Sequence, residues 1–555
     1  MTDIEIPSGK RTRQYRFFEI VPGAISYGMI ILLIVLSVFS PIAAAAYLLV
    51  CIITLLIKAI TIAAHVIGGR RTMVRAENID WHGRLAQLEN PKQSFKRLSS
   101  SSSQGFAYDV HIGNLRSMSE SLSRYPRPSE VYNVVIIAAY NESIDVIDPT
   151  IQSVIDTTYD NKNLVIILAY EQRGGDEIAR TAEILKDRYS STFMYFGTIM
   201  HPTDLPNEVK GKGANITYAG YRVVDILKKL SIPAENTIVT TLDSDNRPHR
   251  TYFDYVTYEF IVHENRKKLS YQPIALYFGN IWDAPAPMRV IATGNSFWTI
   301  ISSMRPHILR NFASHSQPMD ALMEMNFWSK RTIVEDGHQY WRSYFHFDGD
   351  YDVIPIHVPI YQDAVMADTY KGTLIAQFKQ LRRWAYGASD VPYVAERIFT
   401  RKRTVPFWAA IARLARLLDG HVTLASMSLL VALGGWLPLL LNSEAAREIS
   451  AHRLPEVVSS IQFIAMSGML ITIFLSMKML PKRPERYKRT RTLGMVLQWI
   501  LMPVTAIVYN SFASFNAQTH LMFARYLDNF DVTEKATVDS VARAKQAKVD
   551  RRASK

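Results

Sequence analysis

The chain has 555 residues, enough for more than one domain, and 48 % of them are hydrophobic. Its formal charge of +13 could suggest nucleic acid, but the basic residues cluster beside apolar blocks, as in "KRTRQYR" and "GGRRTMVR". That placement indicates membrane orientation and excludes nucleic acid as the expected partner, and a single cysteine, Cys51, excludes a disulfide framework within the chain.

The N-terminal part carries two charge-free apolar blocks, 24–40 and 42–57. About 20 apolar residues is the length that a helix needs to cross a bilayer. A cleaved signal peptide is the alternative, but a second apolar block follows at once, which a secretory leader does not need. We expect a basic cytoplasmic N-terminus at 1–21, two transmembrane helices within 22–67, and a cytoplasmic connector over 68–130.

Residues 131–400 alternate strand and helix patterns, which is typical of a doubly wound, mainly parallel α/β sheet. Short β-rich runs occur at 131–140, 163–170 and 236–242, and a helical pattern at 176–189 follows the second. Ligands of such sheets gather at the carboxyl ends of the strands. Polar residues fall at such ends: Asn141, Glu142, Asp243 and Asp245.

The C-terminal part is apolar again. Residues 401–419 are typical of an interfacial amphipathic helix lying on the membrane, with a helix packed on the soluble domain as the alternative. We expect three or four transmembrane helices within 420–526, drawn from the blocks 422–441, 457–477 and 492–524. The basic tail at 527–555 favours a cytoplasmic end, and therefore a tight hairpin near Tyr509 to Ser514 and six crossings, with five as the alternative.

Asp243 and Asp245 end the apolar run "TIVTTL". Residues i and i+2 of a strand share a face, so both carboxylates approach one point. Two hard oxygen ligands with open positions suit Mg²⁺ or Mn²⁺ that also bridges substrate phosphates. An Asp-rich turn explains the tripeptide alone equally well.

Two further motifs follow in order. Glu335 and Asp336, in "TIVEDGHQYWR", offer a carboxylate that could take a proton from an attacking hydroxyl, or form the acidic first turn of a helix. In "QFKQLRRWAYG", Gln380, Arg383 and Trp384 share one helix face. A cation beside an aromatic plane suits a leaving diphosphate and a sugar ring, although an ordinary amphipathic helix would look the same.

The ordered set Asp-x-Asp, Glu-Asp and Gln-x-x-Arg-Trp, between apolar blocks, resembles the processive family-2 glycosyltransferases, such as cellulose, hyaluronan and chitin synthases. The resemblance covers about residues 131–384. It implies a cytoplasmic GT-A-type α/β domain inserted between N-terminal and C-terminal transmembrane helices. It also implies a nucleotide-sugar donor, in the first instance a UDP-sugar, a divalent metal, and inversion at the anomeric carbon.

The resemblance further implies roles for individual residues, with Asp336 as the general base. The residues that would bind the donor are Tyr140, Asn141, Glu142, Glu171, Lys212 and Asp243. The metal ligands would be Asp243 and Asp245. The residues that would contact the acceptor or the leaving group are Glu335, Gln380, Arg383, Trp384, Thr293, Gly294 and Asn295. The last three lie where the family places an acceptor-binding loop. Two positions depart from the family: Glu171 stands where an aspartate is usual, and the loop lacks the cysteine-containing form of cellulose synthases.

The sequence therefore predicts a metal-dependent inverting glycosyltransferase with its catalytic domain in the cytoplasm. The bacterial inner membrane is the expected location, with an internal eukaryotic membrane as the alternative. The enzyme would extend a growing polysaccharide, with secretion through the same protein as a further hypothesis. A single-addition transferase acting on a lipid acceptor is the alternative, and a non-catalytic membrane protein that binds a nucleotide or a partner is the third reading. Product length separates the first two, and metal-dependent turnover separates both from the third.

Overall fold

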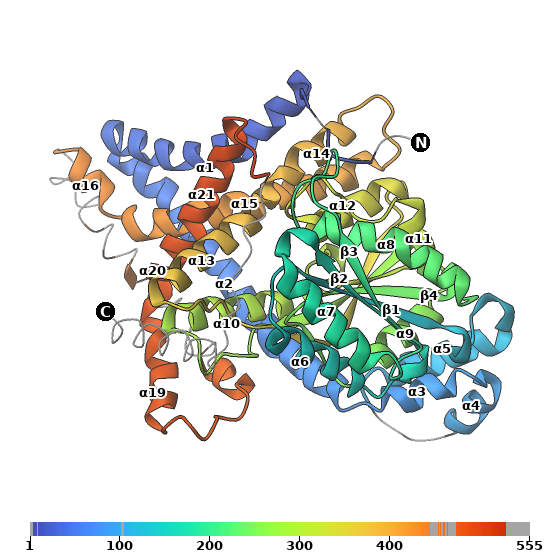
Figure 1. Ribbon diagram of the computed structural model, residues 1–555. Helices are drawn as coiled ribbons and strands as arrows, with labels where there is room; N and C mark the ends of the chain where they lie inside the picture. Colours follow the sequence, from blue (N-terminus) through green and yellow to red (C-terminus); the bar gives the residue numbers. More distant parts are fainter. Residues whose placement is uncertain are drawn as a thin grey trace, which may run out of the picture.

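A computed structural model describes residues 4–7, 9–100, 105–443 and 473–528, together with residues 453, 456, 459, 460 and 463. Long apolar helices gather on one side of a mixed sheet (Figure 1). The predicted apolar block at 457–477 lies mostly outside the described residues, and so does the basic tail after residue 528.

Eight strands form the sheet, in the order β3-β2-β1-β4-β7-β6-β8-β5. They are β1 (Tyr132–Ala139), β2 (Leu164–Glu171), β3 (Tyr195–His201), β4 (Thr237–Asp243), β5 (Arg247–Pro248), β6 (Leu269–Leu276), β7 (Ser316–Pro318) and β8 (Asp352–Tyr361). β1 pairs in parallel with β2 and β4, β2 with β3, and β6 with β8. The short strands β7 and β5 pair antiparallel with their neighbours. The other six strands point the same way, so the prediction of a mainly parallel sheet is confirmed.

Helices cover both faces of the sheet because successive strand residues face opposite sides. Val135 and Ile137 of β1 enter one core, and Val134 and Ile136 enter the other. The first core contains α6 (Ile144–Ile155), α7 (Asp176–Tyr189) and α9 (Tyr252–Val262), and the second contains α8 (Lys212–Lys229) and α11 (Met319–Glu324). Burial on both faces explains why the strands are almost continuously apolar in sequence.

Residues 68–130, expected as a connector, belong largely to the α/β domain. The segment contains the end of α2 (Pro41–Glu77), followed by α3 (Trp81–Gln87), α4 (Pro91–Leu98) and α5 (Tyr108–Glu120). Trp81 stacks on Tyr255 of α9 with ring centroids 3.6 Å apart, and its indole N–H donates to the Ala76 carbonyl at 2.9 Å. Leu85 and Leu115 enter the same core. A few well-spaced apolar side chains thus attach a mainly polar segment to the sheet.

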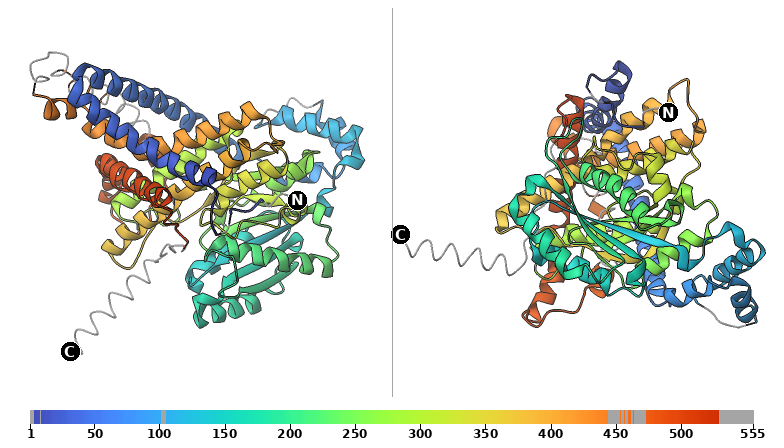
Figure 2. Two further views of the ribbon diagram at one scale, coloured as in Figure 1. Left: turned by 90° about the horizontal axis from the view of Figure 1, so that it is seen from above. Right: turned by 45° about the vertical axis from the view of Figure 1, so that its right-hand side comes forward.

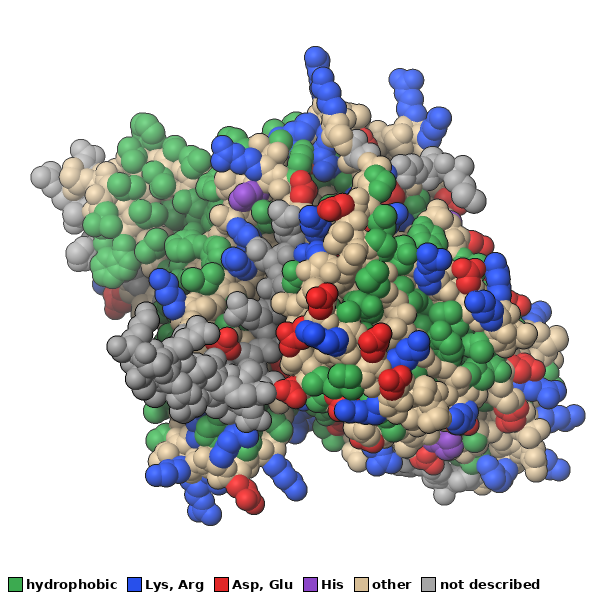
Figure 3. Space-filling view, viewed as in Figure 1, with side chains coloured by type: hydrophobic (Ala, Val, Ile, Leu, Met, Phe, Trp, Pro, Cys, Tyr) green, Lys and Arg blue, Asp and Glu red, His purple; other side chains and the backbone are tan. Residues whose placement is uncertain are grey.

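Four helical segments among the described residues are long and apolar enough to cross a membrane: α1 (Arg13–Phe39), α2, α15 (Phe407–Leu433) and the run Thr490–Met522. Two precede the sheet in sequence and two follow it. Large apolar side chains stay exposed on them, including Phe39 at 80 %. Such side chains gather over α1 and α16 (Leu437–Leu441) in Figure 3, and Figure 2 shows α1 and α2 extending away from the sheet.

The hairpin predicted near Tyr509 to Ser514 is wrong. The chain from Thr490 to Met522 is one unbroken helical run, composed of α19 (Thr490–Leu497), a 3₁₀ turn, α20 (Met502–Thr505), a π-helical segment at Ala506–Ser511 and α21 (Phe512–Met522). The π-helical segment lies where the hairpin was expected to begin, and its wider turn keeps the backbone hydrogen-bonded without reversing the chain.

The separate interfacial helix predicted at 401–419 is also corrected. Residues 407–419 are the first half of α15, which continues unbroken to Leu433. The apolar residues Phe407, Ile411, Leu414 and Leu418 pack against an aromatic cluster from α12 (Glu335–His346) and α14 (Asp390–Ile398). The alternative, a helix packed on the soluble domain, therefore describes this segment.

Candidate functional site

A cavity of about 360 Å³ opens at the carboxyl edge of the sheet. Residues at the ends of five parallel strands line it: Tyr140 after β1, Glu171 of β2, Asp243 of β4, Tyr277 after β6, and Gln362 and Asp363 after β8. The remaining wall comes from α10 (Ala286–Ser303), α12, α13 (Tyr370–Ala385) and α15, among others. This is the edge at which the strand pattern predicts a ligand.

Lys212, the first residue of α8, lies among three carboxylates of the cavity wall. Its Nζ atom is 2.9 Å from Asp243 Oδ1, 3.3 Å from both oxygens of Asp336 and 4.0 Å from Glu335 Oε1. Burial disfavours the charged amine, but the three carboxylates outweigh burial and raise the pKa of Lys212 above its ordinary value. Lys212 is therefore a fixed cation.

The glycine after Lys212 permits this arrangement. A Cβ atom at Gly213 would lie 2.5 Å from the Ser329 carbonyl oxygen and 3.0 Å from Glu335 Cβ. Only a residue without a side chain lets the start of α8 approach the start of α12 so closely. The "KG" pair in the sequence thus positions the lysine next to both acids.

Glu335 and Asp336 form the first turn of α12, so the acidic helix N-terminus and the candidate proton acceptor are the same feature. The Glu335 side chain is 3 % exposed and that of Asp336 is 20 % exposed. Burial, followed by the charge of Asp336, raises the pKa of Glu335 to about 8, against the opposing effect of Lys212. Asp336 is the more accessible of the two acids.

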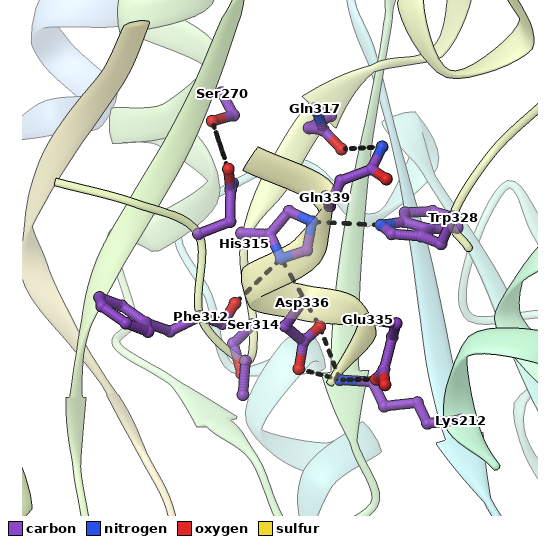
Figure 4. Close-up of polar contacts among 12 residues, drawn as sticks. Lys212, Ser270, Phe312, Ser314, His315, Gln317, Trp328, Glu335, Asp336 and Gln339 are labelled. Atoms are coloured by element: carbon purple, nitrogen blue, oxygen red, sulfur yellow. Dashed lines mark hydrogen bonds and ion pairs between the residues drawn. The ribbon is translucent and has the colours of Figure 1, made fainter. Parts of the chain in front are cut away.

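His315, which the sequence did not single out, packs behind Asp336 (Figure 4). Its Nδ1–H donates to the Phe312 carbonyl at 2.9 Å, and its Nε2 accepts from the Trp328 indole N–H at 3.2 Å. Both ring nitrogens are therefore used by a neutral imidazole, and burial lowers the pKa of His315. Nδ1 lies 3.8 Å from Asp336 Oδ1, so the ring edge fixes one side of that carboxylate.

The predicted helix face of α13 meets the cavity. Gln380, Arg383 and Trp384 all line it, as their spacing on one helix face predicts. The Trp384 ring lies 5.9 Å from the ring of Tyr277, another residue of the wall. Arg383 is close enough to lower the pKa of Glu335, so α13 adds positive charge to the side of the cavity that holds the acids.

Tyr140 and Glu142 line the cavity, whereas Asn141 is exposed and is not part of the wall. Glu171, 5 % exposed, accepts a hydrogen bond from Arg173 at 2.9 Å. The Arg173 guanidinium lies 4.3 Å from the centroid of the Tyr140 ring. Arg173 was missed in the sequence, although it stands two positions after Glu171 in "LAYEQR".

Thr293, Gly294 and Asn295 lie within α10 and not in a loop, which corrects the expectation from the resemblance. Asn295 lines the cavity. Thr293 is buried and donates its hydroxyl to the Arg289 carbonyl at 2.8 Å, and Gly294 is exposed. Of the three, the structure brings Asn295 alone to the cavity.

Asp363 lines the cavity together with Asp243 and Asp245 and contacts Asp245. The Asp363 N–H donates to Asp245 Oδ2 at 3.2 Å, and its carboxylate pairs with Arg247 at 3.2 Å. In the part of the chain that is described, no three His, Cys, Asp or Glu side chains are grouped as a metal site. Mg²⁺ commonly takes one or two carboxylates together with substrate phosphates. The donor chemistry of Asp243 and Asp245 therefore fits a divalent cation that binds with a diphosphate.

Three further ionisable residues line the cavity: Arg310, Asp390 and His421. Asp390 Oδ1 is hydrogen-bonded to His338 Nδ1 at 2.7 Å. His421 lies on α15, so the cavity wall includes one of the long apolar helices. The sequence contains no motif around these residues that would have identified them.

The sequence matches no protein-family model and has no significant match among curated proteins. Similar solved structures include the mannosyltransferase PcManGT from Pyrobaculum calidifontis in complex with GDP-Man and Mn²⁺, at 12 % identity and TM-score 0.36, covering 81 % of this chain and 98 % of that one. S. aureus TarS 1-349 in complex with UDP-GlcNAc is 10 % identical with a TM-score of 0.33, and the match covers 72 % of this chain and 93 % of that one. GalNAc-T7 with UDP, GalNAc and Mn²⁺ is also 10 % identical with a TM-score of 0.33, and the match covers 53 % of this chain and 58 % of that one. Likeness at these scores defines no family.

Proposed function

We propose that the protein is a metal-dependent inverting glycosyltransferase whose sheet domain is of GT-A type. The observation that carries the proposal is the position of Lys212, held between Asp243 and Asp336 at the carboxyl edge of the sheet. Arg383 and Trp384 line the same cavity. Transfer of a sugar from a diphosphate requires fixed cations for the leaving group, a carboxylate for the acceptor proton and a surface that orients the sugar, such as an aromatic ring.

In the proposed reaction, the acceptor hydroxyl gives its proton to the Asp336 carboxylate. The hydroxyl oxygen forms a bond to the anomeric carbon while the bond from that carbon to the diphosphate breaks, and the diphosphate leaves with the bonding electrons. Asp336 suits the role of base better than Glu335, which is more deeply buried and has a raised pKa. Lys212 and Arg383 stabilise the negative charge that develops on the leaving group.

The donor side is assigned to the ends of β1, β2 and β4. Tyr140, Glu142 and Glu171 would contact the nucleoside, and Lys212 the diphosphate. Asp243 and Asp245 would hold Mg²⁺ or Mn²⁺, which when bound supplies Lewis-acid stabilisation of phosphate oxygens. A UDP-sugar is the first donor to test.

We place the acceptor-binding side of the cavity next to the membrane. Four long apolar helices and their basic flanks support a multi-pass protein, with a cytoplasmic catalytic domain and the bacterial inner membrane as its location. His421 of α15 lines the cavity, which would bring the acceptor beside a membrane helix. We favour a growing polysaccharide as acceptor, elongated and coupled to secretion. The same contact favours a lipid acceptor with single addition as the second candidate.

The test uses the full chain in nanodiscs with a panel of nucleotide-sugars. Release of nucleoside diphosphate is measured with Mn²⁺, with Mg²⁺ and with chelator, for the wild type and for Asp336→Asn, and products are sized. The proposal expects metal-dependent release from one donor and its loss in the variant. Long products support the synthase, and a lipid with one added sugar supports the second candidate. Nucleotide binding without turnover of any donor would refute both.

A further inference from the structure

Residues 4–7, here called the N-terminal strap, precede the apolar helix α1 but lie against the α/β domain beside α12 and α14 (Figure 1). Ile6 is 5 % exposed and packs in the cluster that contains Tyr340 and Tyr393. The Tyr393 hydroxyl donates to the Ile4 carbonyl at 2.8 Å, and Arg331 donates to the Ile6 carbonyl at 2.9 Å. Both the backbone and a side chain therefore hold the strap in place.

Glu5 is the polar contact of the strap. Its Oε1 pairs with Arg342 of α12 at 2.9 Å, and its Oε2 accepts from the Ser329 hydroxyl at 2.8 Å. The Arg342 side chain is 1 % exposed and also donates to the Met325 carbonyl at 2.8 Å. Glu5 thus joins α12 to the segment 329–334, which leads into that helix.

The segment 329–334 connects the strap to the charged centre of the cavity. It ends at Glu335 and Asp336, and at its start the Ser329 carbonyl packs on Gly213, where a Cβ atom would lie 2.5 Å away. Lys212, beside Gly213, is paired with Asp336 at 3.3 Å. Close-packed contacts of this kind transmit a displacement, because they contain no free space to absorb it.

We infer that the N-terminal strap, through Glu5, positions Asp336 relative to Lys212. Glu5 is a positioning residue and touches neither donor nor acceptor. The inference rests on the proposed function, in which Asp336 takes the proton of the acceptor. A base misplaced by about 1 Å lowers the rate by about 10²-fold, without weakening the binding of groups that it does not touch.

The test compares Glu5→Gln and Ser329→Ala with a control, Glu264→Gln. Glutamine at position 5 keeps the size and the acceptor for Ser329 but removes the charge that faces Arg342, and Ser329→Ala removes the other contact. Glu264 is an exposed acid paired with Arg124 at 3.2 Å on another part of the domain. We expect kcat to fall about tenfold in both strap variants, with donor KM and nucleotide affinity changed less than about twofold.

Hydrogen exchange gives a readout that does not need turnover. In Glu5→Gln, the amides of residues 329–336 should exchange faster, while those of β1 stay as in the wild type. If no donor turns over but this exchange changes, the glycosyltransferase proposal fails and the strap contact stands. Unchanged exchange and kcat would overturn the inference. So would a parallel fall of kcat, nucleotide affinity and thermal stability, or an equal loss of activity in Glu264→Gln.

Discussion

Lys212 Nζ lies 3.3 Å from each carboxylate oxygen of Asp336, although the two residues are 124 positions apart in the sequence. One residue starts α8 and the other lies in the first turn of α12. The salt bridge therefore joins the N-termini of two helices at the cavity, and both helix ends carry partial positive charge. An anion such as a diphosphate is favoured at such a place.

Replacing Asp336 with Asn should abolish turnover while leaving nucleotide binding intact. Asparagine keeps the shape but accepts no proton, and loss of a general base costs about 10²–10⁴-fold in rate. Release of nucleoside diphosphate and calorimetric binding of the same nucleotide measure the two effects. Asp348→Asn, at an exposed turn after α12, is the matched control and should retain activity. Turnover of Asp336→Asn within tenfold of the wild type would reject the assignment.

Lys212→Met should weaken binding of nucleoside diphosphate by about 10- to 100-fold, because a charged hydrogen bond to phosphate is lost. Affinity for the nucleoside alone should change little, since that part of the ligand is assigned to the ends of β1 and β2. Isothermal titration with both ligands tests the difference. Lys210→Met, an exposed lysine paired with Asp204 at 3.3 Å, is the control. Equal loss of affinity for both ligands would contradict a phosphate contact.

Glu335→Gln should change the pH dependence of stability. The folded protein holds the Glu335 proton to a pKa of about 8, above the ordinary 4.5, so this carboxyl stabilises the fold at low pH. The contribution of Glu335 to the free energy of unfolding is fully present below pH 4.5 and is lost as the pH rises through about 8. Glutamine stays neutral, so the variant should gain a few degrees in Tm relative to the wild type between pH 5 and pH 8. Melting curves in detergent that stay parallel across this range would contradict the raised pKa.

Removal of divalent metal should stop turnover without unfolding the protein. Asp243 and Asp245 offer two carboxylates, and phosphate oxygens of the donor would complete the shell, so the cation is needed for the chemistry and not for the fold. Chelator should abolish release of nucleoside diphosphate, Mn²⁺ or Mg²⁺ should restore it, and the melting curve should stay unchanged. Asp245→Asn should raise the metal concentration needed for half activity. Chelator-resistant turnover would argue against the two-carboxylate site.

The charged residues of the cavity that follow apolar strands could be predicted from the sequence, because such residues reach the same sheet edge. Asp243 was identified by this rule, and Asp363 follows the apolar residues of β8 in the same way but was overlooked. Lys212, at the start of a helix, was predicted only from the family resemblance. His315 could not be predicted. It meets Asp336 through tertiary packing, and the sequence around it has neither a ligand spacing nor a strand pattern.

Two expectations failed because neither took account of packing. The loop at Gly294 and Asn295 was implied by the family resemblance, and the hairpin near Tyr509 followed from the basic C-terminal tail. Apolar neighbours such as Val290 and Phe297 pack into the core on both sides of Gly294, and that burial keeps the helix intact. Tertiary packing overrides local propensity in such cases.

The continuity of α15 has a consequence for the acceptor side of the cavity. The helix packs on Tyr340 through Arg413, places His421 in the cavity wall, and ends at Leu433 among the apolar helices. A membrane helix adjusts its tilt to the thickness of the surrounding hydrocarbon layer. Once the protein sits in a bilayer as proposed, we expect turnover to depend on lipid chain length, because a change in the tilt of α15 would move His421 in the cavity wall.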